Sequence, residues 1–242
     1  MTETLLRNAD IAMYHAKSAG KGCYVLFQAE MQEKLHRRLQ LEADMAGGLA
    51  NQEFFLEYQP IFRVKDNKLV SVEALLRWQH PKHGCVGPDK FLPIAEQSGL
   101  IFDIGTWVLR AACHAATKWQ DFGLRVAVNV SARQFEQEDY VVRTSKALTD
   151  IGLNPNALEL ELTESVMQRT DSRTALMALR SIGISIAIDD FGTGHASLAY
   201  LTRLPLSHLK IAQPFVERIG EGEPHTSIVQ AIIAMATSLN LE

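Results

Sequence analysis

From about residue 50 onward, the sequence alternates between short apolar runs and longer amphipathic stretches, and this alternation is what most limits its fold. The apolar runs predict strands at residues 54–61, 69–76, 124–130, 158–162, 182–188 and 206–211. The stretches between them predict helices at 89–97, 104–122, 139–151 and 170–181, with another starting at about 226. Strands that alternate with helices are usually parallel, so the pattern predicts an α/β fold.

The first two strands are an exception to this parallel pattern. Only a short segment that includes Arg63 to Lys68 lies between them, and it is too short for a helical crossover. We therefore expect an antiparallel hairpin before the parallel strands.

Composition excludes several classes of protein. A chain of 242 residues with 47% hydrophobic content can bury a substantial core, and one domain with an appendage is expected. A formal net charge of -4 argues against a nucleic-acid binder that uses a basic surface. No apolar run is long enough to cross a membrane, and no signal pattern opens the chain, so we expect a cytoplasmic protein. A longer parent chain could still be anchored in a membrane.

The cysteines are three in number, and none has C-x-x-C spacing: Cys23, Cys85 and Cys113. An odd number without this spacing fits neither a disulfide framework nor a zinc site. We interpret them as packing residues of a reducing compartment.

The first 50 residues are organised differently from the rest. Residues 8–18 predict a short helix, and Cys23 to Phe27 predict a strand. Apolar residues recur at helical intervals from Glu30 to Gly48, which predicts an amphipathic connecting helix. Its expected role is to separate two domains or to pair with a partner.

Two adjacent carboxylates, Asp189 and Asp190, follow the apolar run at 185–188 and precede the loop Gly192-Thr193-Gly194. Acids at the end of a buried strand repel each other and lose solvation, so a divalent cation, a basic partner or full solvation must offset this cost. Alternatively, Asp190 simply caps a turn. This segment alone leaves both interpretations open.

Other predicted strands also carry polar residues at or near their ends, and each is an oxygen ligand or a cation: Glu73, Arg77, Asn129, Glu161, Glu164 and Lys210. The carboxyl ends of barrel strands converge on one face, so these side chains would meet there. Any one acid is more often a solvated surface residue. The whole set indicates a site for Mg²⁺ or Mn²⁺, which prefer oxygen ligands.

Several short motifs of the chain resemble those of a known family. Its members share segments that here read Glu73-Ala74-Leu75, Asn129-Val130-Ser131, Glu161-Leu162-Thr163-Glu164, Asp189-Asp190-Phe191-Gly192 and Leu209-Lys210-Ile211. The chain is similar to the EAL domain, a bacterial cyclic di-GMP phosphodiesterase. The resemblance implies a TIM-like (β/α) barrel of the EAL type with an antiparallel first strand. It covers residues 51–242, after a linker helix at 29–50. Residues 1–28 resemble the end of a GGDEF diguanylate cyclase domain, without its signature loop.

The resemblance also implies roles for single residues. Glu73, Asn129, Glu161 and Asp189 would bind a first metal ion, and Asp190 a second. Lys210 would hold or deprotonate the attacking water, or stabilise the developing oxyanion, and the sequence does not separate these roles. The catalytic residues would thus be Lys210, Glu73 and Asp189.

For the substrate, the resemblance assigns Gln59 and Arg77 to the binding of cyclic di-GMP, which would be cut to linear pGpG. Glu164 would hold the loop after Asp190 in its active shape. By analogy with the family, a homodimer is possible.

The chain departs from the family's pattern at two places. Ala212 stands where an aspartate is usual, and His195 and Ala196 replace the usual tyrosine and serine; we expect His195 to be a loop residue rather than a ligand. The chain also stops before the family's last strands, so we expect a barrel incomplete at the C-terminus, a fragment of a longer GGDEF-EAL protein, and little or no hydrolysis by this chain itself.

Two other functions stay open. The chain could be a degenerate EAL domain that senses cyclic di-GMP without cutting it, or a different divalent-metal hydrolase on an α/β barrel.

Overall fold

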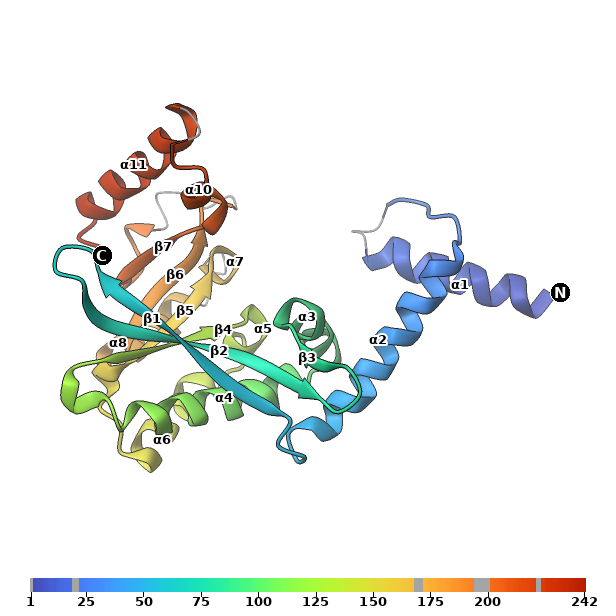
Figure 1. Cartoon of the computed structure of the whole chain (residues 1–242), viewed down its shortest axis with the longest axis horizontal. Coiled ribbons are helices and arrows are strands. Elements are labelled where there is room, and N and C mark those ends of the chain that lie inside the picture. The colour runs from blue at the N-terminus through green and yellow to red at the C-terminus, as the bar shows by residue number, and fades with distance from the viewer. Residues whose placement is uncertain (1, 19–21, 168–171, 194–200, 221–222) are drawn as a thin grey trace. The chain divides into compact units, whose positions relative to one another are not determined.

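The computed structural model describes residues 2–18, 22–167, 172–193, 201–220 and 223–242, and Figure 1 labels its elements. Gly194, His195 and Ala196 lie outside the described residues, as do Thr170 and Asp171 of the predicted helix 170–181. The chain divides into two compact units, Met1–Phe54 with Trp78–Leu100, and Phe55–Arg77 with Ile101–Glu242.

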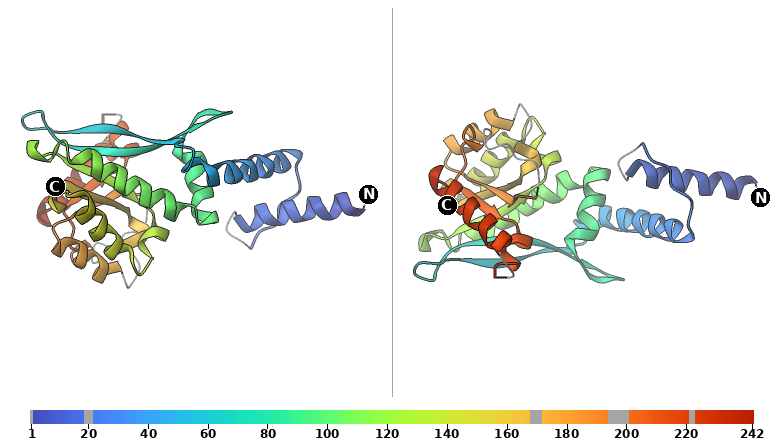
Figure 2. Two further views of the ribbon diagram at one scale, coloured as in Figure 1. Left: turned by 90° about the horizontal axis from the view of Figure 1, so that it is seen from below. Right: turned by 90° about the horizontal axis from the view of Figure 1, so that it is seen from above.

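The first unit is mostly helical. It contains α1 (Thr2–Ser18), α2 (Ala29–Gly48), β3 (Gly84–Val86) and α3 (Pro88–Ser98). Helices α1 and α2 lie side by side (Figure 2). In α2 the apolar Leu41 and Met45, four residues apart, are buried on one face, which is why this stretch forms a helix that packs.

The strand predicted at residues 23–27 is wrong. Residues 23–28 have no regular secondary structure, and the described sheet does not include them. A strand is stable only when its backbone groups pair with a neighbour, which apolar sequence alone cannot supply.

The sheet is the centre of the second unit. Its order is β1-β2-β4-β5-β6-β7, with β3 paired to the far end of β2. The strands are β1 (Phe54–Arg63), β2 (Lys68–His80), β4 (Arg125–Val130), β5 (Leu158–Thr163), β6 (Ser185–Phe191) and β7 (His208–Ile211). Strands β1 and β2 run in opposite directions (Figure 1), and β2, β4, β5, β6 and β7 are parallel. The strands form a curled half-barrel with an antiparallel first strand, which agrees with the TIM-like (β/α) barrel predicted above.

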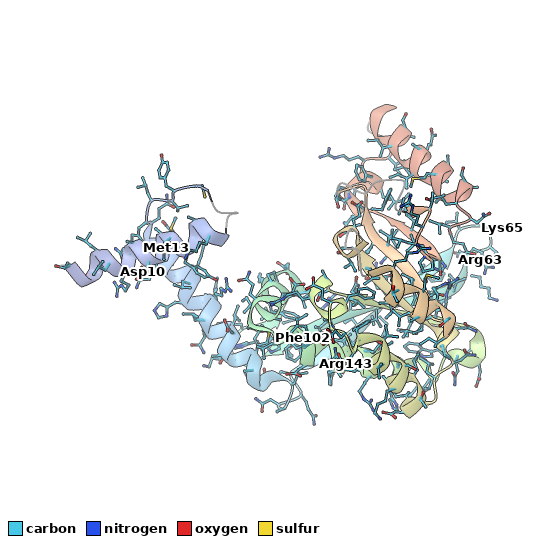
Figure 3. The ribbon with its side chains drawn as sticks, turned by 180° about the vertical axis from the view of Figure 1, so that it is seen from behind. Asp10, Met13, Arg63, Lys65, Phe102 and Arg143 are labelled. Atoms are coloured by element: carbon cyan, nitrogen blue, oxygen red, sulfur yellow. The ribbon has the colours of Figure 1, made fainter. Side chains whose placement is uncertain are left out.

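Helices of the second unit pack against these strands. The longer ones are α4 (Ile101–Ala116), α6 (Tyr140–Ile151), α8 (Ser172–Ser181) and α11 (Glu223–Ser238). Helix α4 packs on β4, α8 on β6 and α11 on β7. Helices α4 and α6 also pack together, and Phe102 and Arg143, one from each, line one small cavity (Figure 3).

Several short helices were not expected: α5 (Ala132–Phe135), α7 (Glu164–Met167), α10 (Gln213–Glu217), and the 3₁₀ turns η1 (Gln120–Phe122) and η2 (Pro155–Ala157). Each is too short to show a helical period. The helix predicted at 104–122 in fact ends at Ala116, and a separate turn, η1, follows it and ends at Gly123 in the left-handed conformation.

The core of the sheet explains why its strands could be predicted. Leu158, Leu160 and Leu162 of β5 and Ile186 and Ile188 of β6 are almost completely buried. Strands buried on both faces read as continuous apolar runs, as these do. Among the described residues, no helix combines the length and the apolar character needed to cross a membrane.

Candidate active site

The register of the sheet places the predicted polar residues on one face. Glu73 lies opposite Ala127, and Asn129, two residues after Ala127, lies opposite Glu161. Glu161 in turn lies opposite Ala187, two residues before Asp189. Because alternate residues of a strand share a face, all four polar side chains project from the same side of the sheet.

Lys210 of β7 lies at the centre of this group. Its Nζ donates hydrogen bonds to Oε2 of Glu161 at 2.7 Å and to Oε2 of Glu73 at 2.9 Å, and it lies 3.4 Å from Oδ1 of Asp189. Asn129 donates from Nδ2 to Oε1 of Glu73 at 2.8 Å. We call these five residues the Lys210 cluster. Residues up to 137 positions apart in the sequence thus meet at one point.

Charge and burial act together in this cluster. Burial, with added repulsion from Glu73 and Asp189 and against the attraction of Lys210, raises the pKa of Glu161 to about 8. Burial alone would lower the pKa of Lys210, but the attraction of Glu161 and its hydrogen bonds to Glu161 and Glu73 outweigh it, so this pKa is raised. Lys210 therefore holds its proton at neutral pH.

Asp190 follows Asp189 at an irregularity in β6. The pairing of β6 with β7 shifts between Ile188 and Phe191, and Asp190 has a φ of 52°. Such a bulge redirects side chains near the end of a strand, so Asp189 and Asp190 need not alternate between the two faces. Burial and the neighbouring Asp189 raise the pKa of Asp190.

Glu164 holds the segment that follows Asp190. It is the first residue of α7, directly after β5, and its Oε1 accepts a hydrogen bond from the backbone N–H of Gly192 at 2.7 Å. Gly192 has a φ of 101°, and a Cβ there would lie 2.7 Å from the ring of Phe215. The position therefore requires glycine both for its backbone and for its space.

Gln59 and Arg77 lie on the hairpin strands. Gln59 is exposed on β1. Arg77 of β2 donates from Nε to Oε2 of Glu57 at 2.7 Å and also to the carbonyl of Leu76. These bonds of Arg77 do not go to the Lys210 cluster. Glu57 was not expected from the sequence, although it lies two residues before Gln59 and so on the same face of β1.

Ala212 directly follows β7, at the position where the family that the sequence resembles usually has an aspartate. Its side chain is buried, and its N–H lies 3.3 Å from the carbonyl oxygen of Phe191. Because this hydrogen bond joins two backbone groups, it does not depend on which side chain stands at position 212.

The oxygen atoms of the Lys210 cluster and of Asp190 fit a hard divalent cation. Carboxylate oxygens of Glu73, Glu161, Asp189 and Asp190 and the amide oxygen of Asn129 are the ligand types that Mg²⁺ and Mn²⁺ prefer. Oε1 of Glu161 is buried and has no hydrogen-bond partner among the described residues. In the part of the chain described, however, no three acids, histidines or cysteines are already arranged around an ion position, because the ammonium of Lys210 lies between the carboxylates.

The chain is similar to known proteins over most of its length. The family model described as the EAL domain matches residues 41–242. The chain is 43% identical over 243 residues to the bifunctional diguanylate cyclase/cyclic di-GMP phosphodiesterase MucR of Pseudomonas aeruginosa, covering 98% of this chain and 36% of the relative. It is 36% identical over 242 residues to the cyclic di-GMP phosphodiesterase PdeR of Escherichia coli, with coverage of 98% and 36%.

Solved structures are also similar to this chain. The phosphodiesterase PaMucR in complex with c-di-GMP superposes with a TM-score of 0.80 at 43% identity, covering 84% of each chain. The FimX EAL domain of Pseudomonas aeruginosa bound to c-di-GMP has a TM-score of 0.74 at 21% identity, covering 83% of this chain and 82% of the other, which supports the fold alone. The chain spans about a third of the length of the curated relatives named above, 36% in each case.

Proposed function

Because the chain belongs to the EAL domain family, we propose that its Lys210 cluster is the active site of a metal-dependent phosphodiesterase that opens cyclic di-GMP to linear pGpG. The observation that carries the proposal is the meeting of Glu73, Asn129, Glu161 and Asp189 around Lys210 at one end of the parallel strands. Two relatives that carry this activity in their names support the choice of substrate.

In this proposal the acids and the amide have the ligand roles. Glu73, Asn129, Glu161 and Asp189 would hold one ion, and Asp190 a second. When bound, Mg²⁺ or Mn²⁺ would neutralise charge on the phosphodiester and acidify the attacking water. The unpartnered Oε1 of Glu161 and the amide oxygen of Asn129 are among the ligand atoms that the hydrogen bonds described above leave available.

Lys210 has a narrower role here than the sequence suggested. Because its pKa is raised by Glu161 and Glu73 despite burial, it is a cation at neutral pH and a poor base. We therefore assign it to orienting the attacking water by donation and to stabilising the oxyanion that develops on the phosphate.

Substrate binding is assigned to the hairpin. The guanidinium of Arg77 suits a pair of phosphate oxygens, and its ion pair with the half-exposed Glu57 holds it in place at 2.7 Å. Gln59, exposed on the adjacent strand, would add a polar contact.

The test measures turnover by the 242-residue chain and by any longer protein that carries it. Each is incubated with cyclic di-GMP and Mg²⁺ or Mn²⁺, with EDTA as the control, and products are separated by chromatography. The proposal expects pGpG from the protein that carries the chain, only with metal, and none after Glu161→Gln. Intact cyclic di-GMP under all conditions would contradict it.

A receptor that binds cyclic di-GMP without cutting it is the second candidate, and Ala212 favours it. A buried alanine directly after β7 removes a carboxylate that the family usually has beside Lys210. Calorimetric titration separates the two functions. A receptor binds equally well in EDTA and returns the ligand intact, whereas the enzyme binds with metal and releases pGpG.

We also propose the division into a GGDEF-like segment (1–28), a linker helix (29–50) and the EAL domain (51–242). The family match begins at residue 41, within α2. Deleting residues 1–28 should then leave cyclic di-GMP binding unchanged, and a loss of binding would contradict the division.

Homodimerisation stays a prediction that analytical ultracentrifugation would test.

A further inference from the structure

A second layer of side chains lies directly beneath the Lys210 cluster. It consists of the residues two positions earlier on the same five strands, which share the face of the cluster: Ser71, Ala127, Glu159, Ala187 and His208. Ser71, Ala127 and Ala187 are small. Glu159 and His208 are therefore the side chains that fill this layer.

Glu159 of β5 and His208 of β7 are in direct contact. Oε2 of Glu159 lies 2.5 Å from Nδ1 of His208, and the two side chains are only 7% and 15% exposed. Among the described residues neither atom has a hydrogen-bond partner, so this close contact is the interaction that the structure shows for both buried atoms. The other ring nitrogen of His208, Nε2, lies 3.4 Å from Oε2 of Glu242, whose side chain is 84% exposed.

The contact crosses a whole strand. Strand β6 lies between β5 and β7, and Ala187 is its residue in this layer, directly opposite His208. The methyl group of Ala187 leaves the space through which the carboxylate of β5 reaches the imidazole of β7. One layer higher, Glu161 of β5 also reaches Lys210 of β7, at 2.7 Å, and there the residue of β6 is Asp189, which lies 3.4 Å from Lys210.

The two contacts are mechanically linked. Glu159 and Glu161 are two residues apart on β5, and His208 and Lys210 are two residues apart on β7. A change in the separation of the strands at the lower layer is therefore passed to the upper one, and a shift of about 1 Å in a catalytic group can cost on the order of 100-fold in rate.

We propose that Glu159 and His208 are a positioning pair that holds β5 and β7 at the separation at which Lys210 bonds to Glu161. Their effect on turnover rests on the proposed phosphodiesterase function. Their effect on the position of Lys210 does not.

The test uses two single variants, Glu159→Gln and His208→Gln, and the exchanged pair Glu159→His with His208→Glu. Each is made in the protein that carries the chain. Asp150→Asn is the matched control, because it removes an ion pair between α6 and α4, away from the cluster. Melting temperatures and near-ultraviolet circular dichroism establish that each variant folds.

The first readout is independent of catalysis. Lys210 is acylated with an amine-reactive ester, and its labelling rate is followed by mass spectrometry. Lys210 should react slowly in the parent protein and in Asp150→Asn, faster in both single variants, and slowly again in the exchanged pair. Equal labelling in the folded single variants and the parent protein would overturn the proposal. If the exchanged pair does not fold, the labelling rates of Lys210 in the two single variants alone test the proposal.

The second readout is kinetic. The single variants should lower kcat for cyclic di-GMP by roughly 10- to 100-fold, with a smaller change in KM, because the binding residues on the hairpin are untouched. The exchanged pair should recover part of kcat. An unchanged kcat in both single variants would overturn the proposal. If the parent protein has no turnover at all, the phosphodiesterase function fails, and the labelling rates still test the positioning pair.

Discussion

Nζ of Lys210 lies 2.7 Å from Oε2 of Glu161, whose side chain is completely buried. Removing one partner of a buried ion pair commonly costs about 3–5 kcal/mol, because the other charge is left without compensation. Lys210 is 28% exposed, and with a pKa of about 8 the carboxyl of Glu161 is mostly protonated at neutral pH, so a value below this range is expected there. The stability of the cluster and its chemistry therefore depend on the same contact.

Replacing Lys210 by methionine should reduce phosphodiesterase turnover by at least about 100-fold, because the donor to the oxyanion is lost. The loss of stability should depend on pH. Burial raises the pKa of Glu161 to about 8, above its ordinary 4.5, so the folded protein binds this proton more tightly than the unfolded chain. The contribution of Glu161 to stability is therefore full below pH 4.5 and is lost as the pH rises toward 8.

Without the positive charge of Lys210, the stabilising contribution of Glu161 should fall further as the pH rises. Lys210→Met should therefore be more destabilised at pH 8 than at pH 6, as measured by urea unfolding without metal. Lys146→Met is the control, because Lys146 is 72% exposed and pairs with Asp150 on the surface of α6. Turnover by Lys210→Met at the rate of the parent protein would refute the role of Lys210.

Glu164 should matter through its carboxylate oxygen rather than through its charge. Glu164→Ala removes the acceptor for the N–H of Gly192 and should lower turnover by roughly 10- to 100-fold, with a higher Mg²⁺ requirement. Glu164→Gln keeps a carbonyl acceptor and should be milder. Turnover measured across a Mg²⁺ titration compares them, and equal loss in both variants would mean that the charge, not the hydrogen bond, is what matters.

Much of this fold could be predicted from local sequence because its strands are buried on both faces. Strand β5 was predicted at 158–162 and is found at Leu158–Thr163. Strand β6 was predicted at 182–188 but spans Ser185–Phe191. It starts later because Gly183, with a φ of 103°, closes the turn after α8, and it ends later because Phe191 pairs with Ile211 beyond the bulge.

The candidate site was predictable in its members but not in its contacts. Glu73, Asn129, Glu161 and Asp189 could be chosen as residues near strand ends. Their bonds to Lys210, the pairing of Arg77 with Glu57, and the contact between Glu159 and His208 depend on how strands far apart in sequence align. In a parallel sheet this register is set by packing across the whole barrel, which a single strand sequence does not record.

Gly192→Ala should destabilise the end of β6 for two reasons that can be separated. Its φ of 101° is strained for alanine, and the added Cβ would meet Phe215 at 2.7 Å. Gly220→Ala is the matched control, because Gly220 has a similar φ of 94° and no atom of the described residues lies within 4 Å of the added Cβ. We expect thermal unfolding to show a loss of about 1 kcal/mol for Gly220→Ala and about 2–3 kcal/mol for Gly192→Ala.

The double variant Gly192→Ala with Phe215→Leu tests the contact itself. The smaller leucine should recover part of the difference between Gly192→Ala and the control, although the backbone strain remains. If Gly192→Ala is no less stable than Gly220→Ala, the segment moves away from Phe215 at little cost, and Gly192 is needed only for its backbone.

Cys113 should be chemically silent in the folded protein. It lies in α4 and is fully buried, whereas Cys23 and Cys85 are exposed. A thiol reagent at pH 8 should therefore label Cys23 and Cys85 at once and Cys113 only when the protein opens, because burial raises the pKa of the Cys113 thiol to about 12. Equal labelling of Cys113 and Cys23 in the native state would contradict the packing of α4.

The same burial makes stability depend on alkaline pH. The ordinary pKa of the thiol is near 9, and in the folded protein it is about 12, so the unfolded chain loses this proton first. The stabilising contribution is complete below pH 9 and declines by up to about 1.4 kcal/mol per pH unit above it. Cys113→Ala should be less stable at pH 7, because it leaves a cavity, but its stability should fall less steeply between pH 9 and 11. Urea unfolding at these pH values measures both slopes, and parallel slopes would show that Cys113 ionises as readily in the fold as outside it.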